Sequence, residues 1–194
     1  AHGLLPDPFF GLNMLDARWT ERCHVWYAHN FVSPSLEGGG RGVGGARIEL
    51  VFKGIDTFAE IYLNGELLGA TDNALIEHVF DVTGRLRPEN ELLVHIRPVA
   101  EVMAAMPDSP DVGCWAFNRE MPYTRKAAHA FGWDIMPRAV SAGLWRPVSL
   151  HARPAERIET VYLTTDRLEV DRAVAGMCWQ VTAGEGCALR VEGR

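Results

Sequence analysis

Two adjacent residues, Trp133 and Asp134, have the side-chain types that commonly bind a sugar. A tryptophan ring offers a flat apolar face to the C–H surface of a pyranose, with an N–H at its edge. A carboxylate accepts charge-assisted hydrogen bonds, which two adjacent sugar hydroxyls can donate. The pair could instead be structural, with Trp133 packed and Asp134 neutralised by Arg125, Lys126 or Arg138. Residue types alone leave both interpretations open.

Other chemistries find little support. Residues 38–45 contain a literal GxGxxG, but a strand pattern follows it where a dinucleotide site requires a helix, so we expect a hairpin loop. Four cysteines and seven histidines form no CxxC, HxH or HExxH spacing, so we expect no metal and no cofactor. The formal net charge of −6 argues against a nucleic-acid partner. No apolar run approaches the roughly 18–20 residues that span a bilayer, so we expect no membrane partner either.

The candidate pair lies in a long segment, residues 123–147, that mixes aromatic, charged and glycine residues without helical or strand periodicity. Well-patterned strands flank this segment on both sides. A loop of this length inside a compact domain is usually functional. We therefore expect the strands to form a scaffold and this loop to carry the site.

Short β-type runs separated by Gly, Pro, Asn and Asp make up most of the chain. Residues 47–53 alternate cleanly, with Ile48, Leu50 and Phe52 on one face, as a strand with one buried face requires. The other runs that we expect to form strands are residues 24–32, 76–82, 91–97, 145–152, 158–164, 177–182 and 188–191.

A β-hairpin is predicted over residues 58–69, where Asn64 and Gly65 separate two apolar runs and accept the positive φ angles of a type I′ turn. Only residues 99–106 read as a helix, which Pro107 would end. Many short strands with almost no helix predict an all-β fold, an antiparallel β-sandwich or jelly roll.

A domain boundary is predicted close to Pro154, after which a new series of strand-type runs separated by turn residues begins. The two domains would be residues 1–153 and residues 154–194. The second stretch is too short for a complete immunoglobulin-like sandwich, which takes roughly 100 residues. We therefore expect it to be a domain that is cut short.

Several strings resemble glycoside hydrolase family 2. KGIDTFAEIYLNGELLG at residues 53–69, followed by FDVTGRL at 80–86 and NELLV at 90–94, resembles the N-terminal sugar-binding domain of that family. RKAAHAFGWDIMPRAVSAGLWRPVSL at residues 125–150 is similar to the β-mannosidase branch, as is PDPFFGLN at residues 6–13. The combination of FGWD, PR and WRP is the specific part of this resemblance.

The resemblance implies a galactose-binding-domain-like jelly roll, then the start of an immunoglobulin-like sandwich, with a (β/α)₈ catalytic barrel belonging to the same polypeptide. It implies a retaining exo-glycosidase that hydrolyses terminal non-reducing β-D-mannose, so the partners are a β-mannoside or related oligosaccharide and the barrel. Both catalytic carboxylates would belong to the barrel, so no catalytic residue is expected in this chain and the chain alone should be inactive. Asp134 would bind hydroxyls of the terminal mannose, and Trp133 would shape the same pocket.

One departure from the pattern concerns specificity. Ile135 and Met136 stand where β-mannosidases commonly have Trp-Gly. A family 2 enzyme acting on another β-glycoside is therefore an alternative. Two further alternatives are a free-standing lectin-like carbohydrate-binding module and a scaffolding domain in which Asp134 forms only an interdomain ion pair. The one Asn-Glu pair, Asn90 and Glu91, opens an expected strand, so we interpret Glu91 as a solvated strand residue.

Overall fold

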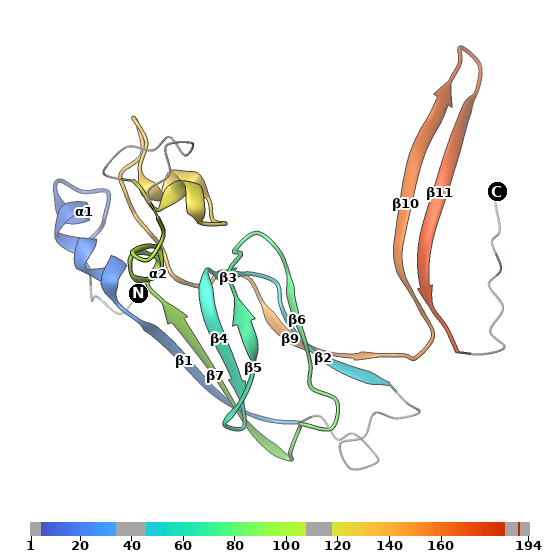
Figure 1. Cartoon of the computed structure of the whole chain (residues 1–194), viewed down its shortest axis with the longest axis horizontal. Coiled ribbons are helices and arrows are strands. Elements are labelled where there is room, and N and C mark those ends of the chain that lie inside the picture. Colours follow the sequence, from blue (N-terminus) through green and yellow to red (C-terminus); the bar gives the residue numbers. More distant parts are fainter. Residues whose placement is uncertain (1–4, 34–45, 108–117, 185–189, 191–194) are drawn as a thin grey trace.

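The computed structural model describes residues 5–33, 46–107, 118–184 and 190. Seven of the strands build a β-sandwich of two antiparallel sheets (Figure 1). One sheet has the strand order β1 (Val25–Val32), β7 (Glu89–Arg97), β4 (Phe58–Leu63) and β5 (Glu66–Thr71). The other has the order β6 (His78–Asp81), β2 (Arg47–Phe52) and β9 (Val148–Arg153). A two-residue strand, β3 (Ile55–Asp56), pairs with β8 (Gly143–Leu144). The all-β sandwich predicted from the sequence is confirmed.

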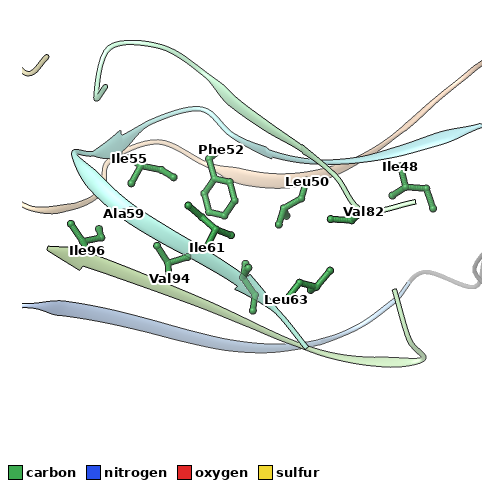
Figure 2. Close-up of a cluster of buried hydrophobic side chains, with 11 residues drawn as sticks. Ile48, Leu50, Phe52, Ile55, Ala59, Ile61, Leu63, Val82, Val94 and Ile96 are labelled. Carbon is green, nitrogen blue, oxygen red and sulfur yellow. The ribbon is translucent and has the colours of Figure 1, made fainter. Parts of the chain in front are cut away.

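The core lies between the two sheets, and Ile48, Leu50 and Phe52 of β2 face it as predicted. The prediction of a single buried face is wrong for β2, because Glu49 and Val51 on its other face are buried too. Figure 2 shows Leu50 and Phe52 of β2 facing Ile61 of β4 and Val94 of β7. Phe52 and Ile61 are fully buried. Burying each large apolar side chain contributes about 1.5–3 kcal/mol, so this layer holds the two sheets together.

The predicted hairpin turn is confirmed. Asn64 has φ 54° and Gly65 has φ 83°, and this pair of positive angles is the type I′ conformation between β4 and β5. The Asn64 amide also donates to the carbonyl of Arg85 and accepts from the backbone N–H of Glu91. The turn is thereby tied to the neighbouring strand β7.

The expectation of a single helix is wrong. The predicted helix exists as α2 (Val99–Met103), shorter than expected. A second helical stretch, α1 (Asn13–Asp16) followed by a 3₁₀ helix (Ala17–Arg22), was not expected. Neither α1 nor the 3₁₀ helix that follows it has a side-chain N-cap or a buried residue. This part of the sequence therefore lacks the capping and amphipathic signals by which a helix is recognised.

The C-terminal strands β10 (Arg157–Leu168) and β11 (Ala173–Thr182) pair only with each other among the described strands and stand apart from the sandwich in Figure 1. Large apolar side chains such as Tyr162 and Leu163 are exposed on this hairpin. A two-stranded hairpin alone is at best marginally stable in water. The boundary between residues 153 and 154, and the assignment of this hairpin to an immunoglobulin-like sandwich, stay predictions.

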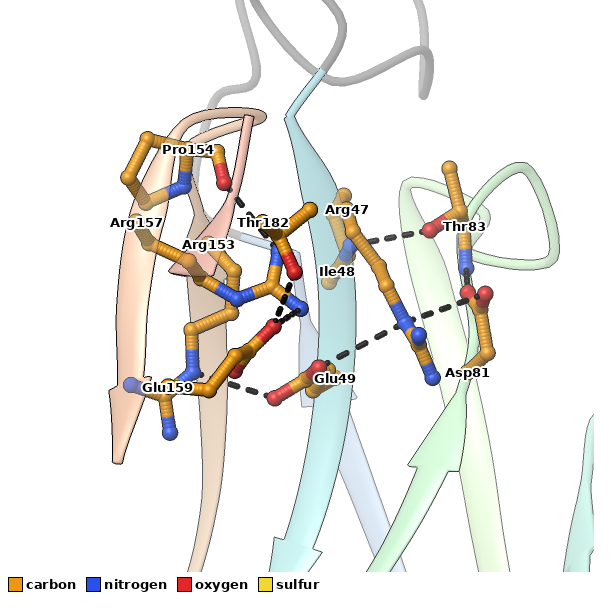
Figure 3. A network of polar contacts seen from close by, with 10 residues as sticks. All are labelled: Arg47, Ile48, Glu49, Asp81, Thr83, Arg153, Pro154, Arg157, Glu159 and Thr182. Carbon is orange, nitrogen blue, oxygen red and sulfur yellow. Dashed lines mark hydrogen bonds and ion pairs between the residues drawn. The ribbon is translucent and has the colours of Figure 1, made fainter. Parts of the chain in front are cut away.

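A network of charged side chains lies at the end of the sandwich next to this hairpin (Figure 3). The nearly buried carboxylate of Glu49 lies between Arg47, 3.4 Å away, and Arg153, 3.0 Å away. Beyond Pro154, Glu159 accepts a hydrogen bond from Thr182 and pairs with Arg157 at 2.7 Å. Hydrogen bonds from Thr182 and Arg157 lower the pKa of Glu159.

Two sequence predictions, the loop at residues 38–45 and nearly all of the strand at 188–191, lie outside the described residues. Among the residues that are described, no helix is long and apolar enough to cross a membrane.

Candidate functional site

Trp133 and Asp134 lie at the tip of a tight, hydrogen-bonded turn. The backbone N–H of Trp133 donates to the carbonyl of Met136 at 2.9 Å, and the N–H of Met136 donates back to Trp133 at 3.1 Å. Asp134 and Ile135 are the two central residues of this turn, and their side chains are exposed. The Trp133 side chain is 68% exposed. The turn therefore projects an aromatic ring and a carboxylate into solvent.

A narrow stem supports the turn. The N–H of Ala139 donates to the carbonyl of Ala130 at 2.9 Å and closes the loop one step below the tip. Gly132 has φ +95°, a conformation that L side chains rarely adopt. A Cβ at Gly132 would lie 3.3 Å from the Cβ of Arg138, so the two sides of the stem approach closely here.

We expect Gly132→Ala to lower the free energy of unfolding by about 1–3 kcal/mol, because alanine adds backbone strain and crowds the opposite side of the stem. Urea unfolding followed by tryptophan fluorescence measures this loss. Gly11→Ala is the matched control, because Gly11 also has a positive φ, +58°, but nothing lies within 4 Å of the position that a Cβ would take there. Equal losses in both variants would contradict a role for crowding at Gly132.

The Asp134 carboxylate makes no hydrogen bond or ion pair with any residue in the part of the chain that the structure describes. Lys126 pairs with Asp56, and Arg138 binds Glu21 through Nη2 at 2.8 Å. Arg125 makes no ion pair with Asp134 either, so the alternative interpretation, in which neighbouring cations neutralise Asp134, is wrong within the described residues.

The ends of the loop meet at a buried ion pair. The Nζ atom of Lys126 bonds to Oδ2 of Asp56 and donates to the backbone carbonyl of Ser141 at 2.6 Å. The hydroxyl of Ser141 donates to the same Asp56 oxygen at 2.8 Å. Burial lowers the pKa of Lys126, although the hydrogen bond and the attraction from Asp56 oppose this effect.

Arg138 links the loop to the N-terminal helical segment. Its guanidinium binds both carboxylate oxygens of Glu21 and reaches Glu120 at 3.4 Å. Burial alone would lower the pKa of Arg138, but its contacts with Glu21 and Glu120 outweigh this and raise it. Phe131, fully buried beneath Arg138, packs against α2. These contacts explain how two short helices help to position a loop.

A cavity of about 440 Å³ lies beside the loop. Its lining includes Met136, Pro137 and Trp145 together with the charged residues Asp56 and Lys126. Trp133 and Asp134 do not line this cavity. The structure therefore separates the exposed turn from a mostly apolar recess at its base.

Sequence reasoning identified Trp133 and Asp134 but missed Asp56 and Ser141, and it considered Lys126 only as a partner of Asp134. No local pattern marks these three, because the pair Asp56 and Lys126 is separated by 70 positions. Glu91 is exposed on β7, as the interpretation of a solvated strand residue requires. Among the described residues, no three His, Cys, Asp or Glu side chains are grouped so that they could hold a metal ion.

Residues 1–146 match the family model described as "Glycosyl hydrolase 2 galactose-binding domain-like". The chain is 33% identical over 187 residues to beta-mannosidase B of Thermothelomyces thermophilus, a match that covers 94% of this chain and 21% of the relative. It is 35% identical over 164 residues to beta-mannosidase B of Emericella nidulans, a match that covers 80% of this chain and 18% of that relative. The chain thus spans about a fifth of the length of these curated relatives.

The fold is similar to that of a solved structure, the beta-D-mannosidase from Dictyoglomus thermophilum. The TM-score is 0.81 at 32% sequence identity, and the match covers 92% of this chain and 22% of that one. The likeness therefore extends beyond the sandwich to most of the chain.

Proposed function

Because the chain belongs to the glycosyl hydrolase 2 galactose-binding domain-like family, we propose that it is the N-terminal part of a retaining exo-glycosidase. The substrate that we propose is a terminal non-reducing β-D-mannose residue. The named relatives and the solved neighbour, all β-mannosidases, support this choice of sugar.

In this proposal Asp134 binds hydroxyl groups of the terminal mannose, and Trp133 forms an adjacent wall of the same pocket. The observation that carries the proposal is the carboxylate of Asp134, exposed at the tip of a hydrogen-bonded turn and without a partner among the described residues. Such a carboxylate needs no rearrangement before it accepts two hydrogen bonds from a sugar. The hydrogen-bonded turn fixes the backbone that carries this carboxylate, so binding has to order only the side chain.

The hydrolytic step requires groups that we place outside this chain. A retaining glycosidase uses two carboxylates about 5–5.5 Å apart, one as acid/base and one as nucleophile. We assign both to a (β/α)₈ catalytic domain, which takes roughly 200–250 residues by itself. The chain of 194 residues alone should therefore not hydrolyse a β-mannoside.

The test is Asp134→Asn and Asp134→Ala in a full-length protein that carries this chain, assayed with an aryl β-D-mannoside. A hydrogen bond to a charged group contributes about 1.5–3 kcal/mol, so kcat/KM should fall by roughly 10- to 150-fold. A contact made chiefly in the transition state would lower kcat and kcat/KM together, whereas one made equally to the bound substrate would raise KM.

The matched control is Glu66→Gln, which removes an exposed carboxylate at the β4–β5 turn, the end of the sandwich opposite the loop (Figure 1). Its kcat/KM should equal that of the unaltered protein. Unchanged kcat/KM in both Asp134 variants would refute the sugar contact and leave a scaffolding role. Submillimolar binding of mannose to the 194-residue chain alone, followed by tryptophan fluorescence, would instead favour a lectin-like module.

A further inference from the structure

The loop that carries Asp134 closes on the only ion pair of the described residues in which the cation's side chain is almost completely buried. The side chain of Lys126 is 2% exposed and that of Asp56 is 11% exposed. Buried charges are tolerated in proteins when they are paired and hydrogen-bonded. Such a pair is weak evidence for stability, because well-packed apolar residues often replace it without loss. Its position in the fold therefore needs another explanation.

Asp56 contacts both ends of the loop through its carboxylate. Its carboxylate accepts hydrogen bonds from Lys126, where the loop begins, and from Ser141, which lies fifteen positions further along the chain. Lys126 also donates directly to the backbone carbonyl and the hydroxyl of Ser141. Asp56 itself is fixed in β3, which pairs with β8 immediately after the loop.

Two smaller closures lie inside this one. The Ala130–Ala139 hydrogen bond closes the stem, and the reciprocal bonds between Trp133 and Met136 close the tip. Each closure shortens the flexible segment that the next must order, and ordering a shorter segment costs less entropy. The position of the Asp134 carboxylate thus depends on a series of contacts that begins at Asp56.

We propose that Asp56 is a positioning residue. It determines the position of the Asp134 carboxylate by holding Lys126 and Ser141 together at the base of the loop. The effect on catalysis rests on the proposed function, whereas the effect on the loop does not. Because a misplacement of about 1 Å in a binding group can cost about 100-fold in rate, a base that opens should impair activity even when the fold survives.

The first arm of the experiment measures the loop in the 194-residue chain by hydrogen exchange of the backbone amides of residues 130–139. Asp56→Asn alone leaves Lys126 as a buried charge without its partner, so the key variant is Asp56→Asn with Lys126→Met, which removes both charges. We expect the loop amides of this double variant to exchange at least about tenfold faster, while β2 and β7 keep their protection. Unchanged loop exchange would overturn the proposal.

The matched control removes a different nearly buried carboxylate from the same sandwich. Glu49 pairs with Arg47 and Arg153 at the end of β2 that adjoins the C-terminal hairpin (Figure 3). Glu49→Gln should leave the exchange of residues 130–139 as in the unaltered chain. Faster loop exchange in this control would mean that any loss of charge in the sandwich loosens the loop, and the proposal would fail.

The second arm measures kinetics in the full-length protein. The double variant should regain stability relative to Asp56→Asn, yet its kcat/KM for an aryl β-D-mannoside should stay at least about tenfold below that of the unaltered protein. Recovery of activity together with stability would show a merely structural role. If the Asp134 variants leave kcat/KM unchanged, the proposed function fails, and the loop exchange alone then decides the positioning role.

A milder variant keeps the test available if both Asp56 variants fail to fold. Ser141→Ala keeps the Lys126–Asp56 pair and removes only the hydroxyl that donates to Asp56. Exchange of residues 130–139 should rise by about three- to tenfold, less than in the double variant, because Lys126 keeps its bonds to Asp56 and to the backbone carbonyl of Ser141. Exchange as slow as in the unaltered chain would overturn the proposal here too.

Discussion

Phe52→Ala is expected to lower the free energy of unfolding of the 194-residue chain by about 3–5 kcal/mol. The Phe52 ring is fully buried and meets the ring of Phe80 edge-on, with centroids 5.9 Å apart. Alanine loses the buried apolar area and this aromatic contact, and it leaves a cavity between two sheets that can collapse only in part. Figure 2 shows the ring facing Ile61 across the sandwich.

Urea unfolding followed by tryptophan fluorescence measures this loss, and Phe10→Ala is its control. Phe10 has the same side chain, but it is 74% exposed, so its removal should change stability by less than about 0.5 kcal/mol. A loss below about 1 kcal/mol for Phe52→Ala would mean that the sheets do not pack on this ring. An unchanged m-value would show that the variant unfolds from an equally compact native state.

The sequence was sufficient to predict the scaffold where local chemistry determines structure. Alternation places Ile48, Leu50 and Phe52 on one face, and all three lie in the core. Asn64 and Gly65 tolerate the backbone angles of a tight hairpin turn, and they form one. Both signals act over a few residues, so they can be read without knowledge of the rest of the fold.

Strand ends were predicted less well, because pairing partners extend strands beyond their own pattern. Strand β10 continues through Thr165 and Arg167 to Leu168, although these residues lack a clear apolar alternation. Ala175, Val174 and Ala173 of β11 pair with them across the hairpin. The backbone hydrogen bonds of the partner decide where such a strand ends.

The site shows the same division between local and long-range information. Residue types singled out Trp133 and Asp134, but they could not decide whether Asp134 is paired. That question depended on where Lys126 and Arg138 find their own partners, and these partners, Asp56 and Glu21, lie 70 and 117 positions away in the chain. Contacts over such separations follow from the topology of the sheets and leave no local signal.

The largest electrostatic effect is expected from Asp56→Asn, which should lower the free energy of unfolding by about 3–5 kcal/mol near neutral pH. The variant keeps the size of the side chain but leaves the buried ammonium of Lys126 without a counter-charge. Asp134→Asn is the matched control. It makes the same chemical change at an exposed carboxylate without a partner among the described residues, so stability should change by less than about 0.5 kcal/mol.

This loss should shrink as the pH rises. Burial already lowers the pKa of Lys126, and in Asp56→Asn the opposing hydrogen bond and attraction are gone, so the pKa falls further. In the unfolded chain the pKa of Lys126 returns to about 10.4. At pH values between the folded-state pKa and this unfolded-state pKa, the unfolded chain binds more protons than the folded chain, so the free energy of unfolding rises with pH. That window begins at a lower pH in the variant, so the stability gap to the unaltered chain should narrow as the pH rises from neutral towards the folded-state pKa of Lys126 in the unaltered chain. A gap that stays constant or widens would mean that Lys126 is not the buried cation that Asp56 compensates, and the double variant with Lys126→Met should show no such pH dependence.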